Sequence, residues 1–312
     1  MSLAFVFPGQ GSQSVGMLTE LASQFPQVEA TFAEASAVLD YDLWALVTNG
    51  PVESLNQTDK TQPAMLAAGI AVWRCWQVNS DIKPDFFAGH SLGEYSALVA
   101  AGSLSFTDAI KLVELRGQFM QQAVPVGEGA MAAILGLDDD AVKAVCNEAS
   151  AKGVAEAVNF NSPGQVVIAG SSEAINVAIE LAKEKGAKRA LLLPVSVPSH
   201  CALMQPAAEQ LKQELDNIAT RQPALPVIHN VTVAISDSDS DIKSLLVKQL
   251  SNPVRWVETI EYFAAQGVDT LIECGPGKVL AGLTKRIDKS ITAFPVFDSA
   301  TLEKAQLVLG EK

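Results

Sequence analysis

The sequence has few cysteines, and their spacing excludes several kinds of site. Only four are present, Cys75, Cys146, Cys201 and Cys274, and no two of them form a Cys-x-x-Cys pair. This pattern disfavours a disulfide framework and a zinc site, and it suits reduced thiols in the cytoplasm. We therefore expect no metal, and we expect Cys201 to be a small buried side chain.

Long apolar runs are also missing. No segment approaches the roughly 20 apolar residues that a membrane-spanning helix needs. The first residues, "MSLAFVFPGQG", have neither the basic segment nor the long apolar stretch of a signal peptide. We therefore expect a cytoplasmic protein that does not engage a membrane.

Positive charge is scarce. The 312 residues include 22 Lys and Arg against 35 Asp and Glu, which gives a formal net charge of −13. Nucleic-acid binding is disfavoured because no basic stripe would neutralise phosphates. Hydrophobic residues make up 48% of the chain, enough for a sizeable core in one large domain with an insertion, or in two domains.

The pattern along the chain predicts alternating strands and helices, interrupted by an insertion. A strand is predicted over 3–7, helices over 28–39, 64–77 and 107–123, and a short strand before Ser91. From Gly127 to Val197 the predicted order is β-α-β-β-α-β, which is that of a ferredoxin-like split unit. The α/β pattern resumes afterwards, so we expect a discontinuous domain, 1–126 and 198–312, around a subdomain at 127–197.

One tight turn presents a candidate nucleophile. The stretch "AGHSLGEYSALVAAG" places Ser91 in a Gly-x-Ser-x-Gly between a predicted strand and a predicted helix. In that context the pattern predicts a nucleophile elbow, with the serine at a helix N-terminus that favours developing negative charge. The alternative is a purely structural turn.

A serine nucleophile needs a base, and the chain has only three histidines. His90 adjoins the serine on a sharp turn, where it is expected to pack or to form a hydrogen bond elsewhere. His229 lies in a predicted strand and is expected to be a core histidine. His200 precedes a predicted helix, whose N-terminus would keep the ring neutral, so we favour His200 as the general base.

Arg116 lies in the apolar stripe of a predicted helix. Ala109, Leu112, Val113 and Met120 share its face at spacings of three or four residues. A buried arginine must be paired, because an isolated buried charge costs several kcal/mol. Two alternatives are open at this point: an internal salt bridge, or a fork that binds the carboxylate of a substrate.

These residues lie in motifs that resemble a known family nearly end to end. The motifs are "FVFPGQGSQ", "TQPA", "AGHSLGEYSALVAAG", "RGQFMQ", "NFNSPGQVVIAG", "VPSHCALM", "QLSNPVRW" and "ECGPGKVL", in this order. Together they resemble the bacterial malonyl-CoA:acyl-carrier-protein transacylases of fatty-acid synthesis.

The resemblance implies roles for individual residues. It makes Ser91 the nucleophile and His200 the general base, oriented by the backbone carbonyl of Gln249 instead of by an acid. Arg116 then binds the substrate carboxylate, and the backbone N–H groups of Gln10 and Leu92 form the oxyanion hole. Three further polar residues border the cleft without an assigned role: Gln62, Asn159 and Asn161.

The same resemblance implies a fold, a reaction and a partner. The fold is an α/β-hydrolase-like domain carrying the ferredoxin-like insertion. The reaction moves a malonyl group from malonyl-CoA to the phosphopantetheine thiol of acyl carrier protein through a malonyl-serine ester, with no cofactor. In the family's modular relatives, Phe before the histidine tends to mark malonyl selection and Ser tends to mark methylmalonyl selection. Ser199 stands here, as is common in free-standing bacterial members, and malonyl stays the expected acyl group.

An acidic carrier protein requires a local basic surface on an acidic chain. The best candidates are Lys188 with Arg189 and Lys285 with Arg286. The alternative for each pair is a solvated helix face. Two alternative functions also stay open, a serine thioesterase or esterase of related fold and an inactive carrier-binding module.

Overall fold

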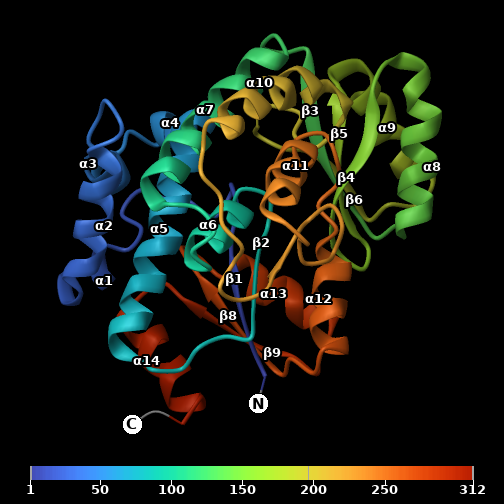
Figure 1. Ribbon diagram of the computed structural model, residues 1–312. Coiled ribbons are helices and arrows are strands. Elements are labelled where there is room, and N and C mark those ends of the chain that lie inside the picture. Colours follow the sequence, from blue (N-terminus) through green and yellow to red (C-terminus); the bar gives the residue numbers. More distant parts are fainter. Residues whose placement is uncertain (1, 196, 311–312) are drawn as a thin grey trace.

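A five-stranded parallel sheet is the larger of the two sheets (Figure 1). The computed structural model describes residues 2–195 and 197–310. The strand order is β7-β2-β1-β8-β9. The strands are β1 Leu3–Phe7, β2 Phe86–Gly89, β7 Val227–Ile228, β8 Thr270–Cys274 and β9 Thr292–Val296.

The central strand shows why this sheet lies inside the molecule. Every residue of β1, "LAFVF", is buried. Phe5 and Phe7 point into one apolar cluster, and Ala4 and Val6 point into another on the opposite face. Since side chains alternate between the faces of a strand, a continuous apolar run is what a sheet covered on both faces requires.

Helices cover both faces of the parallel sheet (Figure 1). The larger cluster packs long apolar helices against Phe5 and Phe7, and the smaller one packs Trp256, Ile260 and Leu283 against Ala4 and Val6. The helices outside residues 127–197 are α1 Thr19–Gln24, α2 Pro26–Ser36, α3 Leu43–Asn49, α4 Val52–Leu55, α5 Thr58–Asn79, α6 Gly93–Ala100, α7 Phe106–Ala123, α10 Gln205–Asp216, α11 Asp239–Gln249, α12 Trp256–Ala265, α13 Val279–Ile287 and α14 Ser299–Val308.

A separate four-stranded antiparallel sheet occupies the middle of the chain. Its strand order is β4-β5-β3-β6, and the chain order β3-α8-β4-β5-α9-β6 is the predicted one. The elements are β3 Gly129–Leu135, α8 Asp139–Ala149, the 3₁₀ turn η1 Ser150–Lys152, β4 Ala155–Ser162, β5 Gln165–Ser171, α9 Ser172–Glu184 and β6 Arg189–Leu192. The last strand is shorter than predicted, and Ser196 in its predicted range lies outside the described residues.

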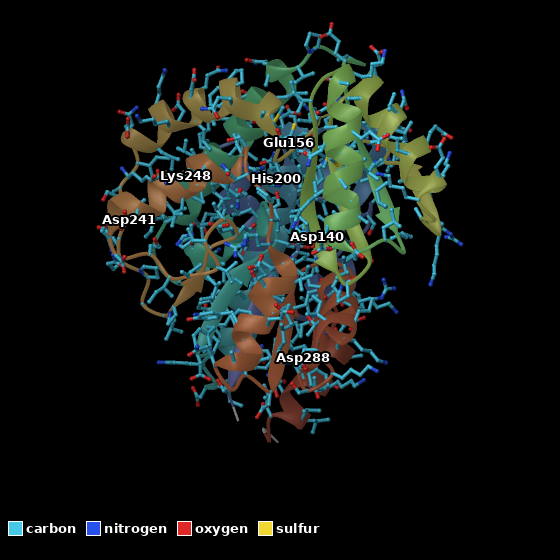
Figure 2. All side chains as sticks on the ribbon, turned by 90° about the vertical axis from the view of Figure 1, so that its right-hand side faces the viewer. Asp140, Glu156, His200, Asp241, Lys248 and Asp288 are labelled. Carbon is cyan, nitrogen blue, oxygen red and sulfur yellow. The ribbon has the colours of Figure 1, made fainter. Side chains whose placement is uncertain are left out.

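The two faces of this second sheet have different neighbours. Ile134 and Ile168 pack with α8 and α9 in a core of their own. Met131 and Val167 point to the other side, where they pack with Cys201 from the segment that follows the small sheet. Figure 2 shows Glu156 of β4 near His200, and the Glu156 carboxylate accepts the backbone N–H of Ala202 at 3.2 Å. This face of the small sheet therefore lies against the segment that carries His200.

The carboxyl ends of the parallel strands gather the loops of interest. The segment Pro8–Gln10 follows β1, Ser91 follows β2, and Asn230 follows β7. This edge of a parallel sheet is where open α/β folds bind ligands. Across the described part of the chain, none of the helices combines the length and apolar character that crossing a bilayer would need.

Candidate active site

Ser91 sits on a strained turn between β2 and α6, with φ of 52°. The turn requires glycine on both sides. A Cβ on Gly89 would lie 1.8 Å from the carbonyl carbon of Gly93, and one on Gly93 would lie 2.0 Å from the carbonyl oxygen of Phe7. Gly-x-Ser-x-Gly therefore has a steric cause here: only glycine lets strand and helix approach this closely. The geometry matches the predicted elbow.

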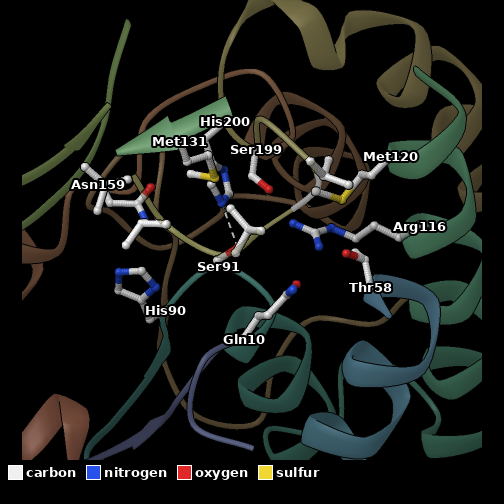
Figure 3. A pocket seen from close by; sticks show the side chains of 14 residues that line it. Gln10, Thr58, His90, Ser91, Arg116, Met120, Met131, Asn159, Ser199 and His200 are labelled. Carbon is white, nitrogen blue, oxygen red and sulfur yellow. Dashed lines mark hydrogen bonds between the residues drawn. The ribbon is translucent and has the colours of Figure 1, made fainter. Parts of the chain in front are cut away.

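His200 meets Ser91 across the site. Its Nε2 lies 2.7 Å from Ser91 Oγ (Figure 3). Its Nδ1 lies 2.7 Å from the backbone oxygen of Gln249. A carbonyl oxygen only accepts, so Nδ1 carries the proton and Nε2 accepts the hydrogen bond that the Ser91 hydroxyl donates. His200 thus has the tautomer that a general base needs, and a backbone carbonyl fixes it.

The His200 ring is kept neutral, but the cause differs from the predicted one. Burial lowers its pKa to about 3, and the nearby Arg116 cation adds to the effect. The predicted cause was a helix N-terminus. A short 3₁₀ turn, η2 Ala202–Met204, follows the histidine, and α10 begins only at Gln205. Desolvation therefore replaces the helix dipole as the reason for a neutral base.

Arg116 is buried, 1% exposed, and neutral amides hold it. Its Nη1 donates to Gln62 Oε1 at 2.7 Å and its Nη2 to Gln249 Oε1 at 3.1 Å. The Tyr95 ring lies 5.4 Å from the guanidinium carbon. Within the described residues no carboxylate forms an ion pair with it, which disfavours the internal salt bridge. Burial lowers the pKa of Arg116, yet its ordinary value is so high that the group stays cationic.

One pocket connects these groups (Figure 3). Ser91 and His200 lie at its centre, with Arg116 on one side and Asn159 on the other. Ser199 and Met120 also line it, next to Arg116 in the view. The pocket therefore presents a serine hydroxyl, a neutral imidazole and a buried cation to a single small molecule.

The two predicted oxyanion donors lie beside the serine. Leu92 immediately precedes α6, and Gln10 lies in the loop after β1 and lines the pocket. That loop packs against the elbow so closely that a Cβ on Gly9 would lie 2.5 Å from the carbonyl oxygen of His90. Neither the Gln10 nor the Leu92 N–H donates to another of the described residues, so both amides have no hydrogen-bond acceptor among them.

Sequence reasoning missed a buried polar cluster behind the elbow. The Glu94 carboxylate, 1% exposed, accepts from His229 Nδ1 at 2.7 Å, from Asn230 N at 3.0 Å and from Gln249 Nε2 at 2.8 Å. Asn230 Oδ1 in turn accepts the Ser91 N–H at 2.8 Å. The only available signal was Glu94 itself, a charged residue in the first turn of the mostly apolar helix α6, "GEYSALVA".

The structure also places the motif residues that have no catalytic role. His90 Nε2 lies 2.8 Å from Asn161 Oδ1, and the His90 ring packs 5.5 Å from that of Trp256. His90 is thus a packing and hydrogen-bonding group, as expected, and burial lowers its pKa. Gln62 orients Arg116, and Asn159 lines the pocket. Cys201 and His229 are buried, as predicted.

The two basic pairs lie at one end of the antiparallel sheet. The register sets Arg189 opposite Leu135 and Leu135 opposite Gln165. Arg286, from the last turn of α13, donates to Gln165 Oε1 at 2.8 Å. All four basic side chains, Lys188, Arg189, Lys285 and Arg286, are exposed. Between residues 2 and 310, apart from 196, no cluster of three or more His, Cys, Asp or Glu is arranged to hold a metal ion.

Comparison with known proteins agrees with this geometry. The acyl transferase domain matches residues 4–306. The malonyl CoA-acyl carrier protein transacylase of Salmonella typhimurium is 58% identical over 97% of this chain and 98% of its own, and that of Escherichia coli K12 is 57% identical over the same shares.

The comparison with solved structures also finds malonyltransferases. The acyl carrier protein S-malonyltransferase of Vibrio cholerae superposes with a TM-score of 0.96 at 59% identity, covering 98% of this chain and 100% of that one. A malonyl-transacylase in complex with a type II PKS acyl-carrier protein superposes at 0.97 with 57% identity, over 98% and 99% of the two chains. The chain belongs to the acyl transferase family and, within it, to the malonyl-CoA:acyl-carrier-protein transacylases.

Proposed function

We propose that this protein moves a malonyl group from malonyl-CoA to the phosphopantetheine thiol of acyl carrier protein, through an ester on Ser91. One observation carries the proposal: the Ser91–His200 pair at 2.7 Å opens into the same pocket as the buried Arg116 cation. The names of the relatives, and the relative solved with a carrier protein, point to the same substrates.

The first half-reaction loads the serine. His200 Nε2 takes the Ser91 proton as Oγ attacks the thioester carbonyl, and the oxygen of the tetrahedral intermediate accepts hydrogen bonds from the Gln10 and Leu92 amides. The intermediate collapses, the C–S bond breaks, and the thiolate of CoA takes the proton from His200. Arg116 meanwhile pairs with the malonyl carboxylate.

The second half-reaction runs the same steps in reverse with a new thiol. His200 accepts the proton of the phosphopantetheine thiol, its sulfur attacks the malonyl ester, and Ser91 Oγ leaves with that proton. Both thioesters are chemically alike, so the transfer is nearly thermoneutral. Protein side chains and backbone amides supply every group in this scheme, which needs no cofactor.

Transfer must outcompete hydrolysis kinetically. Pairing of the malonyl carboxylate with Arg116 fixes the ester and fills the space beside it. An acetyl group leaves the buried cation with its amide partners alone, at a cost of roughly 3–5 kcal/mol relative to a paired site. Arg116 therefore selects for a dicarboxylic acyl chain.

We further infer a two-part organisation, with an α/β-hydrolase-like catalytic domain, 1–126 and 198–312, and a ferredoxin-like subdomain, 127–197. Two observations support it: the parallel and antiparallel sheets are separate, and the antiparallel sheet has an apolar core of its own. The pocket takes residues from both parts, such as Ser91 and Met131. A cytoplasmic location is consistent with four buried free thiols.

We also propose that Lys188, Arg189, Lys285 and Arg286 dock the acidic carrier protein. The Arg286–Gln165 contact and the register from Gln165 to Arg189 support a single basic surface made from both parts of the chain. Such a surface gives the carrier a local attraction that the net charge of −13 opposes elsewhere.

The decisive experiment is the intact mass of the protein after brief mixing with malonyl-CoA. We expect one added malonyl group on the wild type, none on Ser91→Ala, and transfer of that group to holo carrier protein in a second step. CoA release without a thiol acceptor would favour a thioesterase. Neither CoA release nor added mass would favour an inactive carrier-binding module.

A further inference from the structure

We propose that Glu94 is a positioning residue for this reaction: it fixes Gln249, whose side-chain oxygen holds the cation that recognises the substrate carboxylate and whose backbone oxygen holds the general base. The proposal rests on the transfer reaction proposed above. Glu94 does not line the pocket, so it acts through other residues.

Gln249 joins the two halves of the site. Its backbone oxygen accepts from His200 Nδ1, and its side-chain oxygen accepts from Arg116 Nη2. The amide nitrogen of the same side chain donates to the Ser91 carbonyl at 2.9 Å and to Glu94 Oε2 at 2.8 Å. Gln249 is fully buried, so its amide has no water to exchange these partners with.

Glu94 decides which way that amide points. A carboxylate only accepts, so it selects the NH₂ end of Gln249 and leaves the oxygen end for Arg116. With the amide reversed, its NH₂ would face the guanidinium, donor against donor. A buried polar group without a partner costs more than an ordinary hydrogen bond contributes, so the Glu94 contact fixes one orientation.

The same carboxylate holds the turn of the nucleophile. It accepts the backbone N–H of Asn230, whose side chain accepts the Ser91 N–H at 2.8 Å and donates to the Gly89 carbonyl at 2.7 Å. His229 Nδ1 contacts the other carboxylate oxygen. Glu94 also adds a negative charge to a buried region whose cation, Arg116, has only neutral hydrogen-bond partners.

The test measures selectivity, because misfolding alone leaves selectivity unchanged. We expect Glu94→Met, which leaves no acceptor for Gln249 Nε2, to lower the ratio of malonyl to acetyl kcat/KM in the loading step by roughly 10- to 100-fold, with a higher KM for malonyl-CoA. A loss of folded protein would lower both rates equally and leave KM and the ratio unchanged.

Glu273→Met is the matched control. Glu273 is also fully buried, and its carboxylate accepts the backbone N–H groups of Leu280 and Ala281, away from Gln249. It therefore loses a buried carboxylate of the same kind. We expect lower stability and an unchanged selectivity ratio.

A second variant isolates the route through Gln249. Gln249→Met removes the amide and keeps the backbone carbonyl that orients His200, so we expect the same loss of selectivity. The double variant should lose no more than either single one, because both remove the same contact. Additive losses, or an unchanged ratio in both single variants, would overturn the proposal. A wild type that loads no malonyl group would instead refute the transfer reaction itself.

Discussion

His200 Nε2 lies 2.7 Å from Ser91 Oγ, although the two residues are 109 positions apart in the chain. Both have a left-handed backbone, with φ of 67° and 52°. Only two other non-glycine residues of the described ranges, Leu18 and Val233, share it. Such conformations cost about 1–3 kcal/mol each and persist only where the surrounding structure enforces them. The fold therefore holds this pair in place before substrate arrives.

Arg116→Met should reverse acyl selectivity. It keeps an apolar side chain of similar length in the buried site and removes the cation. Loading from malonyl-CoA should lose about 2–5 kcal/mol in kcat/KM, roughly 30-fold or more, because the malonyl carboxylate loses its partner. Loading from acetyl-CoA should change little or rise. Rapid-quench loading with both substrates measures the ratio, and an unchanged ratio would refute carboxylate recognition by Arg116.

The pH profile of loading should lack the usual histidine limb. Because burial and the Arg116 cation lower the pKa of His200 to about 3, the ring stays unprotonated well below the ordinary value of 6.5. The single-turnover rate should therefore stay flat through pH 6.5 and fall only far below it. Arg116→Met removes the positive charge of Arg116, which is the second cause of the lowered His200 pKa, so the acid limb should move to higher pH. A wild-type limb at 6.5 would contradict the assignment.

The same shift makes stability depend on pH. Between pH 6.5 and about 3 the unfolded chain binds a proton on residue 200 that the native protein does not bind. The free energy of unfolding should therefore fall as the pH falls, by at most about 1.4 kcal/mol per pH unit from this group. Denaturant titrations of the wild type and of His200→Gln isolate the contribution, because other groups cancel. If the free energies of unfolding of the wild type and of His200→Gln changed in parallel with pH, His200 would not have the lowered pKa.

Substituting a glycine of the elbow should have the opposite effect on stability from substituting a glycine within a helix. Gly89→Ala places a Cβ 1.8 Å from a Gly93 backbone atom, so we expect lost loading activity and a large drop in Tm. Gly282 in α13 has no atom within 4 Å of an added Cβ. Gly282→Ala should therefore stabilise the protein by about 0.5–1 kcal/mol and leave loading intact. Thermal unfolding and malonyl loading of both variants check this.

Charge reversal should separate carrier docking from loading. Lys188→Glu with Arg189→Glu should raise the KM for acyl carrier protein, more at low salt than at high salt, and leave malonyl loading unchanged. The matched control is Lys212→Glu with Lys304→Glu, which makes the same change in net charge at exposed positions of α10 and α14. An equal rise in both double variants would indicate a net-charge effect, with no docking surface at Lys188 and Arg189.

The sequence by itself determined the local parts of the site. Gly89-x-Ser91-x-Gly93 between a strand and a helix predicts the elbow because the steric demand is confined to five consecutive residues. With three histidines in the chain, His200 could be chosen by elimination, and Arg116 stood out because a cation in an apolar stripe needs a partner. The order of the elements from 129 to 192 followed from hydrophobic periodicity together with turn and helix-cap residues.

Only the tertiary structure decided how these parts are joined. Glu94, Asn230 and Gln249 come from three distant segments, and no local pattern shows that they share hydrogen bonds. The neutral state of His200 depends on burial by the whole fold, which is why the helix dipole was the wrong cause. Strand register and packing brought Arg189 and Arg286 to one sheet end. Contacts between distant segments, unlike turns and periodicities, depend on how the complete chain packs.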